Sequence, residues 1–194
     1  MWRLQVARCL SIAGHPLVFF PLAVWIALAS RTSGIQTLPL ALAFFALLGS
    51  GVMLYSWLQV RRGRWGHVDA SLPHERRSLN GLLLAALSAS ALVVSFQPQA
   101  RGLALGIAVS CCLIGAALLT ARWIKASLHV AFLVFASTIL WQVSLGLVAA
   151  ALAFTAAVGW SRLELDRHSL AEVLVGAALG LVAGGAFWFV VLQM

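Results

Sequence analysis

Charged residues are scarce in this chain. Asp, Glu, Lys and Arg make up 9% of its 194 residues, whereas hydrophobic residues make up 62%, and the mean hydropathy is +1.00. A composition this poor in charge excludes a water-soluble domain. It predicts an all-α, polytopic membrane protein in which residues 1–194 form a single integral-membrane bundle.

Acidic residues are especially rare, and this scarcity argues against two classes of lipid enzyme. Membrane-embedded prenyltransferases hold Mg²⁺ on a diphosphate with Asp-rich clusters, and alcohol phosphotransferases that use nucleotide-activated lipids also need clustered aspartates. The chain contains no Asp-x-x-x-Asp pair, and its acidic residues are Asp69, Glu75, Glu164, Asp166 and Glu172. Both classes are therefore poor candidates.

Cysteine is also rare, and all three cysteines lie in or beside apolar segments, at positions 9, 111 and 112. This placement is typical of small hydrophobic residues and not of disulfides or metal ligands. The first apolar run has no small-residue cleavage site ahead of it, which predicts an uncleaved first helix.

Long apolar runs are abundant, and several exceed the roughly 18 residues that a spanning helix needs. As one helix, residues 125–160 would be about 50 Å long, well beyond a ~30 Å hydrocarbon core. We therefore expect two short spans joined by a tight turn near Gln142. The sequence predicts six to seven spans, with apolar segments at about 13–30, 37–60, 80–97, 102–121, 126–141, 144–160 and 169–192.

Seven spans place the N-terminus and the loops at 61–79, 122–127 and 161–168 on one face. All but Arg31 and Arg101 of the 13 Lys and Arg residues then share this face, and the tryptophans fall near the two interfaces. The positive-inside rule makes the basic face cytoplasmic, in what we expect to be a bacterial inner membrane. The net charge of +8 then indicates loop orientation and anionic partners such as membrane lipids, and not nucleic acid.

The basic face carries three polar stretches with candidate phosphate ligands, at residues 69–77, 125–129 and 161–172. In the third, His168 and Glu172 lie four residues apart at a predicted helix start, so they share a helix face. Glu172 is placed to accept the ring N–H of His168. That contact would fix the tautomer and leave the other ring nitrogen as a nucleophile.

Other side chains in these stretches suit the same chemistry. Arg162 offers a planar guanidinium that fits two phosphate oxygens. His129, near the start of the fifth span, is placed to donate a proton to a leaving alkoxide, and backbone N–H groups at helix starts add anion-binding capacity. The prediction requires that the rings of His168 and His129 lie around one pocket.

In these stretches the chain resembles the type 2 phosphatidic acid phosphatases, relatives of the vanadium haloperoxidases and bacterial acid phosphatases. The family's third motif is Ser-Arg, five residues, His, three residues and Asp. Ser161, Arg162 and His168 match it in identity and spacing, and Glu172 replaces the Asp.

The other two motifs of the family are present in degraded form. The second, Pro-Ser-Gly-His, keeps Ser127 and His129. The first, Lys, six residues and Arg-Pro, keeps Arg76, with Asp69 at the Lys position and Arg77 at the Pro position. The resemblance covers about residues 60–192 and predicts a core similar to that family's there.

The resemblance implies hydrolysis of a lipid phosphate monoester without a metal or cofactor. His168 would attack phosphorus with Glu172 as its partner, His129 would protonate the departing alcohol, and water would cleave the phosphohistidine. The residues expected to bind phosphate are Arg162, Arg76, Ser127, Lys125 and Ser161, with Asp69 and Arg77 at altered positions of the first motif.

Several alternatives stay open. Phosphatidate, phosphatidylglycerophosphate, a polyprenyl phosphate and a polyprenyl-linked sugar phosphate all suit a basic pocket at the bilayer surface. Asp69 and Leu128, at altered motif positions, favour an impaired relative that binds or transports a lipid phosphate. A phosphotransferase is the third alternative, because cleavage of the phosphohistidine by water or by an alcohol acceptor needs the same residues.

Some polar and small residues have simpler interpretations. His67 and His74 lie in a polar loop and are expected to be solvated, and His15, just before Pro16, marks the start of the first helix. A row of small residues in the last span predicts close helix packing, within the bundle or in a homo-oligomer. The row consists of Gly176, Gly180 and Gly184.

Overall fold

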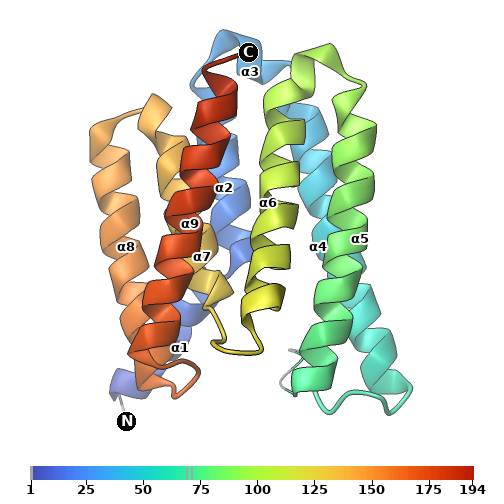
Figure 1. Cartoon of the computed structure of the whole chain (residues 1–194), viewed down its shortest axis with the longest axis vertical. Coiled ribbons are helices and arrows are strands. Elements are labelled where there is room, and N and C mark those ends of the chain that lie inside the picture. The colour runs from blue at the N-terminus through green and yellow to red at the C-terminus, as the bar shows by residue number, and fades with distance from the viewer. Residues whose placement is uncertain (1, 69, 71) are drawn as a thin grey trace.

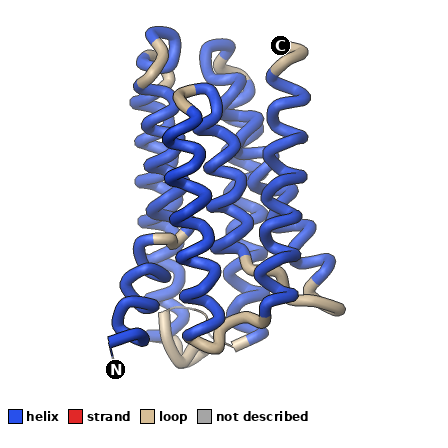
Figure 2. Tube along the Cα trace, turned by 90° about the vertical axis from the view of Figure 1, so that its left-hand side faces the viewer, coloured by secondary structure: helices blue, strands red, loops and turns tan. Residues whose placement is uncertain are grey.

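The computed structural model describes residues 2–68, 70 and 72–194 and builds this part of the chain from helices and loops alone (Figures 1 and 2). The all-α prediction is confirmed. The helices in chain order are α1 (Trp2–Ala13), α2 (Pro16–Ala29), α3 (Thr32–Ile35), α4 (Leu38–Arg61), α5 (Pro73–Ser95), η1 (Pro98–Ala100), α6 (Arg101–Thr120), α7 (Leu128–Ile139), η2 (Leu140–Gln142), α8 (Leu145–Glu164) and α9 (Leu170–Val191).

Five helices in the described part are long and apolar enough to cross a membrane: α4, α5, α6 with the preceding η1, α8 and α9. The pair α1 and α2 makes a sixth candidate if it is counted as one bent span. The segment expected at 126–141 is helical, but α7 has only 12 residues. By length the described chain therefore holds five to six candidate spans plus one shorter apolar helix. The seventh span of the prediction is not reached.

The first span differs from the expected segment at 13–30. The chain bends by 53° between α1 and α2, and α2 begins at Pro16, which lacks an N–H and suits a first helical position. His15 caps this helix, because its Nδ1 accepts the N–H of Leu17 at 3.2 Å. The expected segment therefore corresponds to α2, and the more polar helix α1 precedes it.

The turn expected near Gln142 is confirmed by η2, which separates α7 from α8. The Ser144 hydroxyl then caps α8 by accepting the N–H of Leu147 at 3.1 Å. Helix α5 instead begins well before the expected residue 80, because Glu75 stabilises its polar start. Its two carboxylate oxygens accept the N–H groups of Gly66 at 2.8 Å and Leu72 at 2.9 Å.

The glycine row of α9 packs on α7 within the same chain (Figure 1). A Cβ atom on any of the three glycines would collide with α7, at Ser127, Ala131 and Thr138. Trp188 strengthens the contact, since its Nε1 donates to the carbonyl oxygen of Thr138 at 2.8 Å. This agrees with the expected close packing within the bundle, because α7 covers that face, and the homo-oligomer through Gly176, Gly180 and Gly184 stays a prediction.

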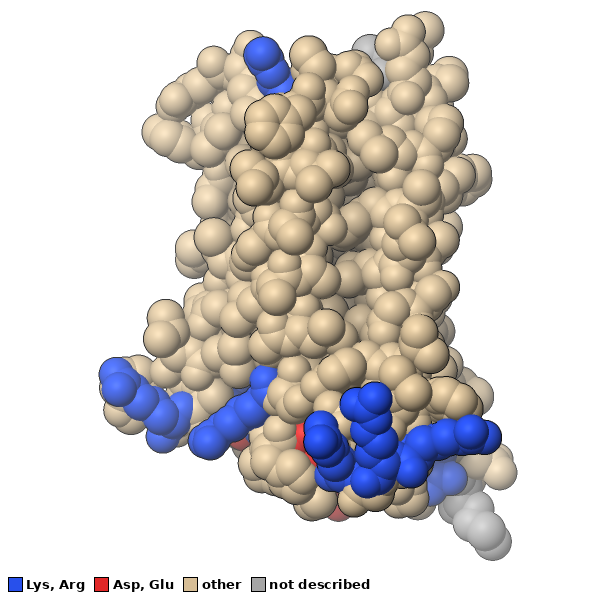
Figure 3. All heavy atoms as spheres, turned by 90° about the vertical axis from the view of Figure 1, so that its right-hand side faces the viewer, with Lys and Arg blue, Asp and Glu red and all other residues tan. Residues whose placement is uncertain are grey.

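Basic side chains gather at one end of the bundle, as expected (Figure 3). This end holds the N-terminus, the α4–α5 loop, the α6–α7 loop and the α8–α9 loop, whereas the C-terminus lies at the opposite end (Figures 1 and 2). Charged groups are expensive in hydrocarbon, so a membrane places this end at an interface. We call it the basic end.

We expect Gly180→Ala to destabilise the protein, because a Cβ there would collide with the carbonyl oxygen of Ala131. Overpacking of this kind costs about 1–3 kcal/mol of unfolding free energy. Gly185→Ala is the matched control, because its Cβ would enter open space and should stabilise the helix by up to about 1 kcal/mol. Thermal unfolding in detergent measures the change in stability of both variants. Equal changes in their unfolding temperatures would contradict the tight α7–α9 contact.

Compartment reporters fused at the C-terminus and in the α4–α5 loop should report opposite sides of the membrane, because the fold places these points at opposite ends (Figure 1). A third reporter in the α6–α7 loop serves as a control and should match the α4–α5 loop. Matching signals from the C-terminus and the α4–α5 loop would contradict this topology.

Candidate active site

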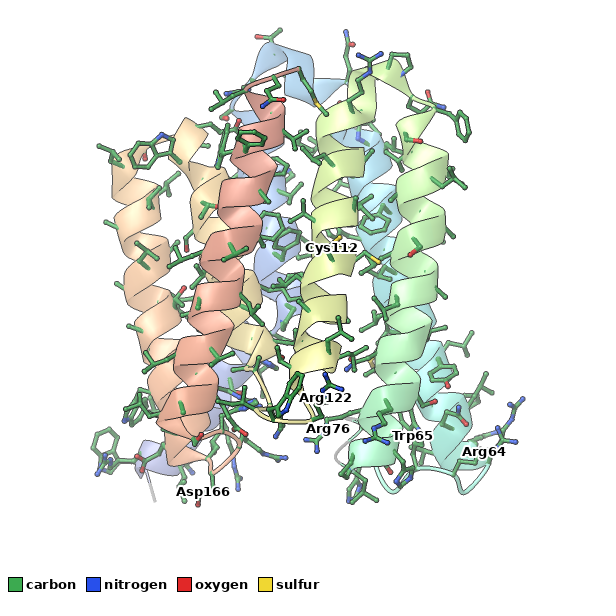
Figure 4. The ribbon with its side chains drawn as sticks, viewed as in Figure 1. Arg64, Trp65, Arg76, Cys112, Arg122 and Asp166 are labelled. Atoms are coloured by element: carbon green, nitrogen blue, oxygen red, sulfur yellow. The ribbon has the colours of Figure 1, made fainter. Side chains whose placement is uncertain are left out.

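A cavity of about 1540 Å³ lies inside the bundle and reaches the basic end. Side chains from α1, α5, α7 and α8 and from three loops meet there, although they are far apart in sequence. The polar residues that line the cavity at this end are Arg8, Ser11, His15, Arg76, Arg77, Asn80, Lys125, His129, Arg162, Arg167 and His168. Figure 4 shows Arg76 labelled at this end of the bundle, near the loop that follows α6.

His168 lies in the α8–α9 loop and makes the predicted contact with Glu172. Its Nδ1 lies 3.0 Å from Oε2 of Glu172, and its side chain is only 7% exposed. Glu172 also belongs to a capping box: Oε2 accepts the N–H of Ser169 at 3.0 Å, and the Ser169 hydroxyl accepts the N–H of Glu172 at 3.3 Å. The carboxylate is therefore fixed, and Nε2 is the ring nitrogen left for chemistry.

The surroundings keep His168 neutral. Burial, followed by the positive charges of Lys125 and Arg162, lowers the pKa of His168 from 6.5 to about 4, and Glu172 only partly opposes this. At physiological pH the ring is uncharged. With its proton on Nδ1, donated to Glu172, the Nε2 atom carries a free lone pair.

Arg162, in the last turn of α8, is held by α1. Its Nη1 donates to the hydroxyl of Ser11 at 2.7 Å. Its Nε is buried and has no hydrogen-bond partner among the residues that the structure describes. A buried N–H without an acceptor costs free energy, so the guanidinium is suited to receive one from a ligand.

The α8–α9 loop folds back on Arg162 and brings Lys125 to the site. The N–H groups of Arg167 and His168 both donate to the carbonyl oxygen of Arg162, at 3.0 and 3.3 Å. Lys125, from the α6–α7 loop, donates through Nζ to the carbonyl oxygen of Arg167 at 3.1 Å. Burial and then the charge of Arg76 lower the pKa of the Lys125 ammonium, and both cations line the cavity.

His129 lies in the first turn of α7 and contacts a second imidazole, that of His15. The ring centroids are 5.1 Å apart and the planes are nearly perpendicular, at 89°. Sequence reasoning assigned His15 only to the helix start, where it does cap α2, and it missed Ser11. No local signal identifies either residue, because the bend between α1 and α2 brings both to the cavity.

The structure does not bring all the predicted ligands together. Ser127 and Ser161 are fully buried and do not line the cavity. The Ser161 hydroxyl donates to the carbonyl oxygen of Val158 in its own helix at 2.7 Å, and the Ser127 N–H donates to the carbonyl oxygen of Glu172 at 3.0 Å. Arg77 lines the cavity and is exposed, and Asp69 lies outside the described residues.

Imidazole and cationic groups dominate this set of donors. In residues 2–68, 70 and 72–194, no group of three or more His, Cys, Asp or Glu side chains is placed to hold a metal ion. The arrangement of Arg, Lys and neutral His favours an anion with several oxygen atoms, such as a phosphate group.

No protein-family model, curated protein or solved structure matches this chain. No relative therefore indicates what the cavity binds, and its chemistry is inferred from the residues that line it. The motif resemblance in residues 161–172 stays a prediction.

We expect Lys125→Met to raise the pKa of His168 above about 4, because it removes a positive charge that opposes protonation. Glu172→Gln should lower it further, because the carboxylate favours the charged ring. Histidine-selective NMR titration in detergent measures both shifts, with His168→Gln to assign the signal. Arg31→Met, at the opposite end of the bundle, is the control and should leave the pKa unchanged.

The same shift has a consequence for stability. The ring titrates near 6.5 when unfolded and near 4 when folded, so the unfolded chain binds more protons between these values. Stability contributed by neutral His168 is thus present above pH 6.5 and is lost as the pH falls to about 4. A folded-state titration near 6.5, or an unchanged value in Lys125→Met, would contradict the described environment.

Proposed function

We propose that this protein is an integral-membrane phosphatase that hydrolyses a lipid phosphate monoester through a phosphohistidine on His168. The observation that carries the proposal is the pairing of Nδ1 of His168 with Glu172 at 3.0 Å, in the wall of a cavity lined by cations. A neutral imidazole oriented by a carboxylate is suited to act as a nucleophile. The surrounding cations attract the phosphate.

In the first step, the Nε2 lone pair of His168 forms a P–N bond while the P–O ester bond breaks. Glu172 stabilises the positive charge that develops on the ring through its hydrogen bond to Nδ1. The electron pair of the ester bond leaves on the alcohol oxygen, which takes a proton from His129. The products of this step are the free lipid alcohol and the phosphohistidine.

Whether His129 carries the second ring proton depends on the substrate being bound. Burial, then the charge of Arg162 and the neighbouring His15, disfavour a positive charge on the His129 ring while the cavity holds no anion. A bound phosphate brings negative charge that opposes the field of Arg162. Binding therefore prepares the acid only when there is a leaving group to protonate.

In the second step, water gives a proton to His129 and its oxygen attacks phosphorus. The P–N bond breaks, its electron pair returns to Nε2 of His168, and inorganic phosphate leaves. Arg162, Arg76 and Lys125 stabilise the charge on the equatorial oxygens in both steps. Every group in this cycle belongs to the chain, the substrate or water.

The resemblance to the type 2 phosphatidic acid phosphatases supports the same assignment. The order and rough spacing of the three motifs fit that family, and the residues Arg76, His129, Arg162 and His168 that keep motif identities all line the cavity. We therefore propose that the chain is a distant relative of the family. We also propose that the basic end faces the cytoplasm of a bacterial cell, following the positive-inside rule.

The test is phosphate release in detergent from phosphatidate, phosphatidylglycerophosphate and a polyprenyl phosphate. We expect release that resists EDTA and is inhibited by vanadate. His168→Ala should lower the rate by about a thousandfold or more, and Glu172→Gln should lower it less. His67→Ala and His74→Ala are matched controls, since both rings belong to exposed residues outside the cavity wall and should not affect the rate.

A ³²P-labelled substrate should also leave an acid-labile phosphoryl group on the wild-type chain and none on His168→Ala. Transfer of the label to an added alcohol instead of water would identify a phosphotransferase. Binding of lipid phosphate without release from any substrate would identify a binding or transport protein. Either outcome contradicts the hydrolase.

A further inference from the structure

The cavity continues far beyond the phosphate site. From the basic end its wall runs inside the bundle to Gln142, at the end of η2, and to Trp188 and Val191, in the last turns of α9. Along α6 the wall runs from Gly102 to Leu118, nearly the whole of this 20-residue helix. At ~1.5 Å per residue the helix is about 30 Å long, close to the thickness of a hydrocarbon core.

The long part of the cavity is lined by apolar side chains. Phe20, Phe44, Leu103, Ile107 and Phe132 belong to its wall. Between the basic end and Arg31, at the far end, the described wall contains no Lys, Arg, Asp or Glu. The cavity wall therefore passes from a cationic end to an apolar body, and charged and amide side chains return only at the far end, with Arg31, Gln99 and Gln142.

A cavity of this kind suits an apolar occupant. Water is a poor solvent for an apolar wall, and this wall bounds a partly open space of about 1540 Å³ that an apolar chain is suited to fill. Drug-sized ligands occupy pockets of about 300–1,000 Å³. A phosphate group, or a short phosphate ester, would leave most of the space empty.

We infer that this cavity binds the hydrocarbon tail of a lipid phosphate, so that the tail lies inside the bundle while the phosphate meets His168. The inference rests on the proposed function for the identity of the head group. The occupant has one long tail, because the cavity is about as deep as a full hydrocarbon core and an acyl chain spans only one leaflet. The substrate class is a phosphate of a long, linear, polyprenyl-type alcohol.

Two glycines of α6 offer a matched pair of variants. Gly106 lines the cavity, and a Cβ there would meet only Phe187, at an ordinary contact distance of 3.8 Å. Gly115 lies nine residues later in the same helix, outside the cavity wall and facing open space. At ~100° per residue the two positions are on opposite faces of α6. Gly106→Phe therefore obstructs the cavity and Gly115→Phe does not.

The first experiment is photolabelling with a polyprenyl phosphate that carries a diazirine at the end of its tail. In the wild-type chain we expect labels on cavity residues such as Ile107 and Phe187. Gly106→Phe should reduce this labelling by about tenfold or more, and Gly115→Phe should leave it unchanged. A probe with the same tail but a free alcohol in place of the phosphate should label about tenfold less.

Labelling confined to outward-facing residues such as Leu119, which is 73% exposed, would overturn the inference. Equal labelling by the alcohol probe would overturn the lipid phosphate as the occupant. Because the wild-type labelling map needs no variant, poor folding of Gly106→Phe would not leave the inference untested.

The second experiment compares phosphate release from polyprenyl phosphates of increasing length. Gly106→Phe should lower kcat/KM for the longest substrate by about tenfold or more and leave the shortest unchanged. Labelling without any hydrolysis would support the tail site and contradict the proposed phosphatase activity. Hydrolysis with no effect of tail length or of Gly106→Phe would retain the phosphatase and reject the tail site.

Discussion

The close contact between α7 and α9 is the constraint on which the rest of the site depends. Because Gly176 has no side chain, α9 lies against the backbone of Ser127, whose N–H donates to the carbonyl oxygen of Glu172 at 3.0 Å. This contact joins the start of α7, which carries His129, to the start of α9, which carries the carboxylate partner of His168. Two imidazoles that are distant in sequence are thereby held in the wall of one cavity.

The bilayer explains why the polar residues of the site gather at the basic end. Helices that cross hydrocarbon must satisfy their own backbone groups, and charged side chains are expensive within it. Polar chemistry therefore collects where helices begin and end. The α6–α7 and α8–α9 loops supply Lys125, Arg167 and His168, while the bend before α2 adds His15 from a third direction. The apolar helices between the two ends are left to enclose a hydrocarbon-like interior.

The sequence predicted most strongly those features that depend on local patterns. Helices α4, α6 and α9 fall within one residue of the expected segments, because each boundary coincides with the end of an apolar run. The pairing of His168 with Glu172 follows from helical spacing alone. Features that depend on packing were missed. The more polar helix α1 brings Ser11 to Arg162, and the Ser161 hydroxyl bonds to its own helix at Val158, which no motif reveals.

The electrostatics of the basic end connect binding to chemistry. Its cations far outnumber its carboxylates among the described residues: Glu164 pairs with Arg3 on the outside, and Glu75 caps α5. Without an anion this field disfavours protonation of His168, which keeps its lone pair available. In the proposed mechanism, a bound phosphate opposes this field at His129, so that the ring can hold the proton that the leaving alcohol needs. The same cations attract the phosphate and keep the lone pair of His168 available, so an added carboxylate here would weaken phosphate binding and favour protonation of His168.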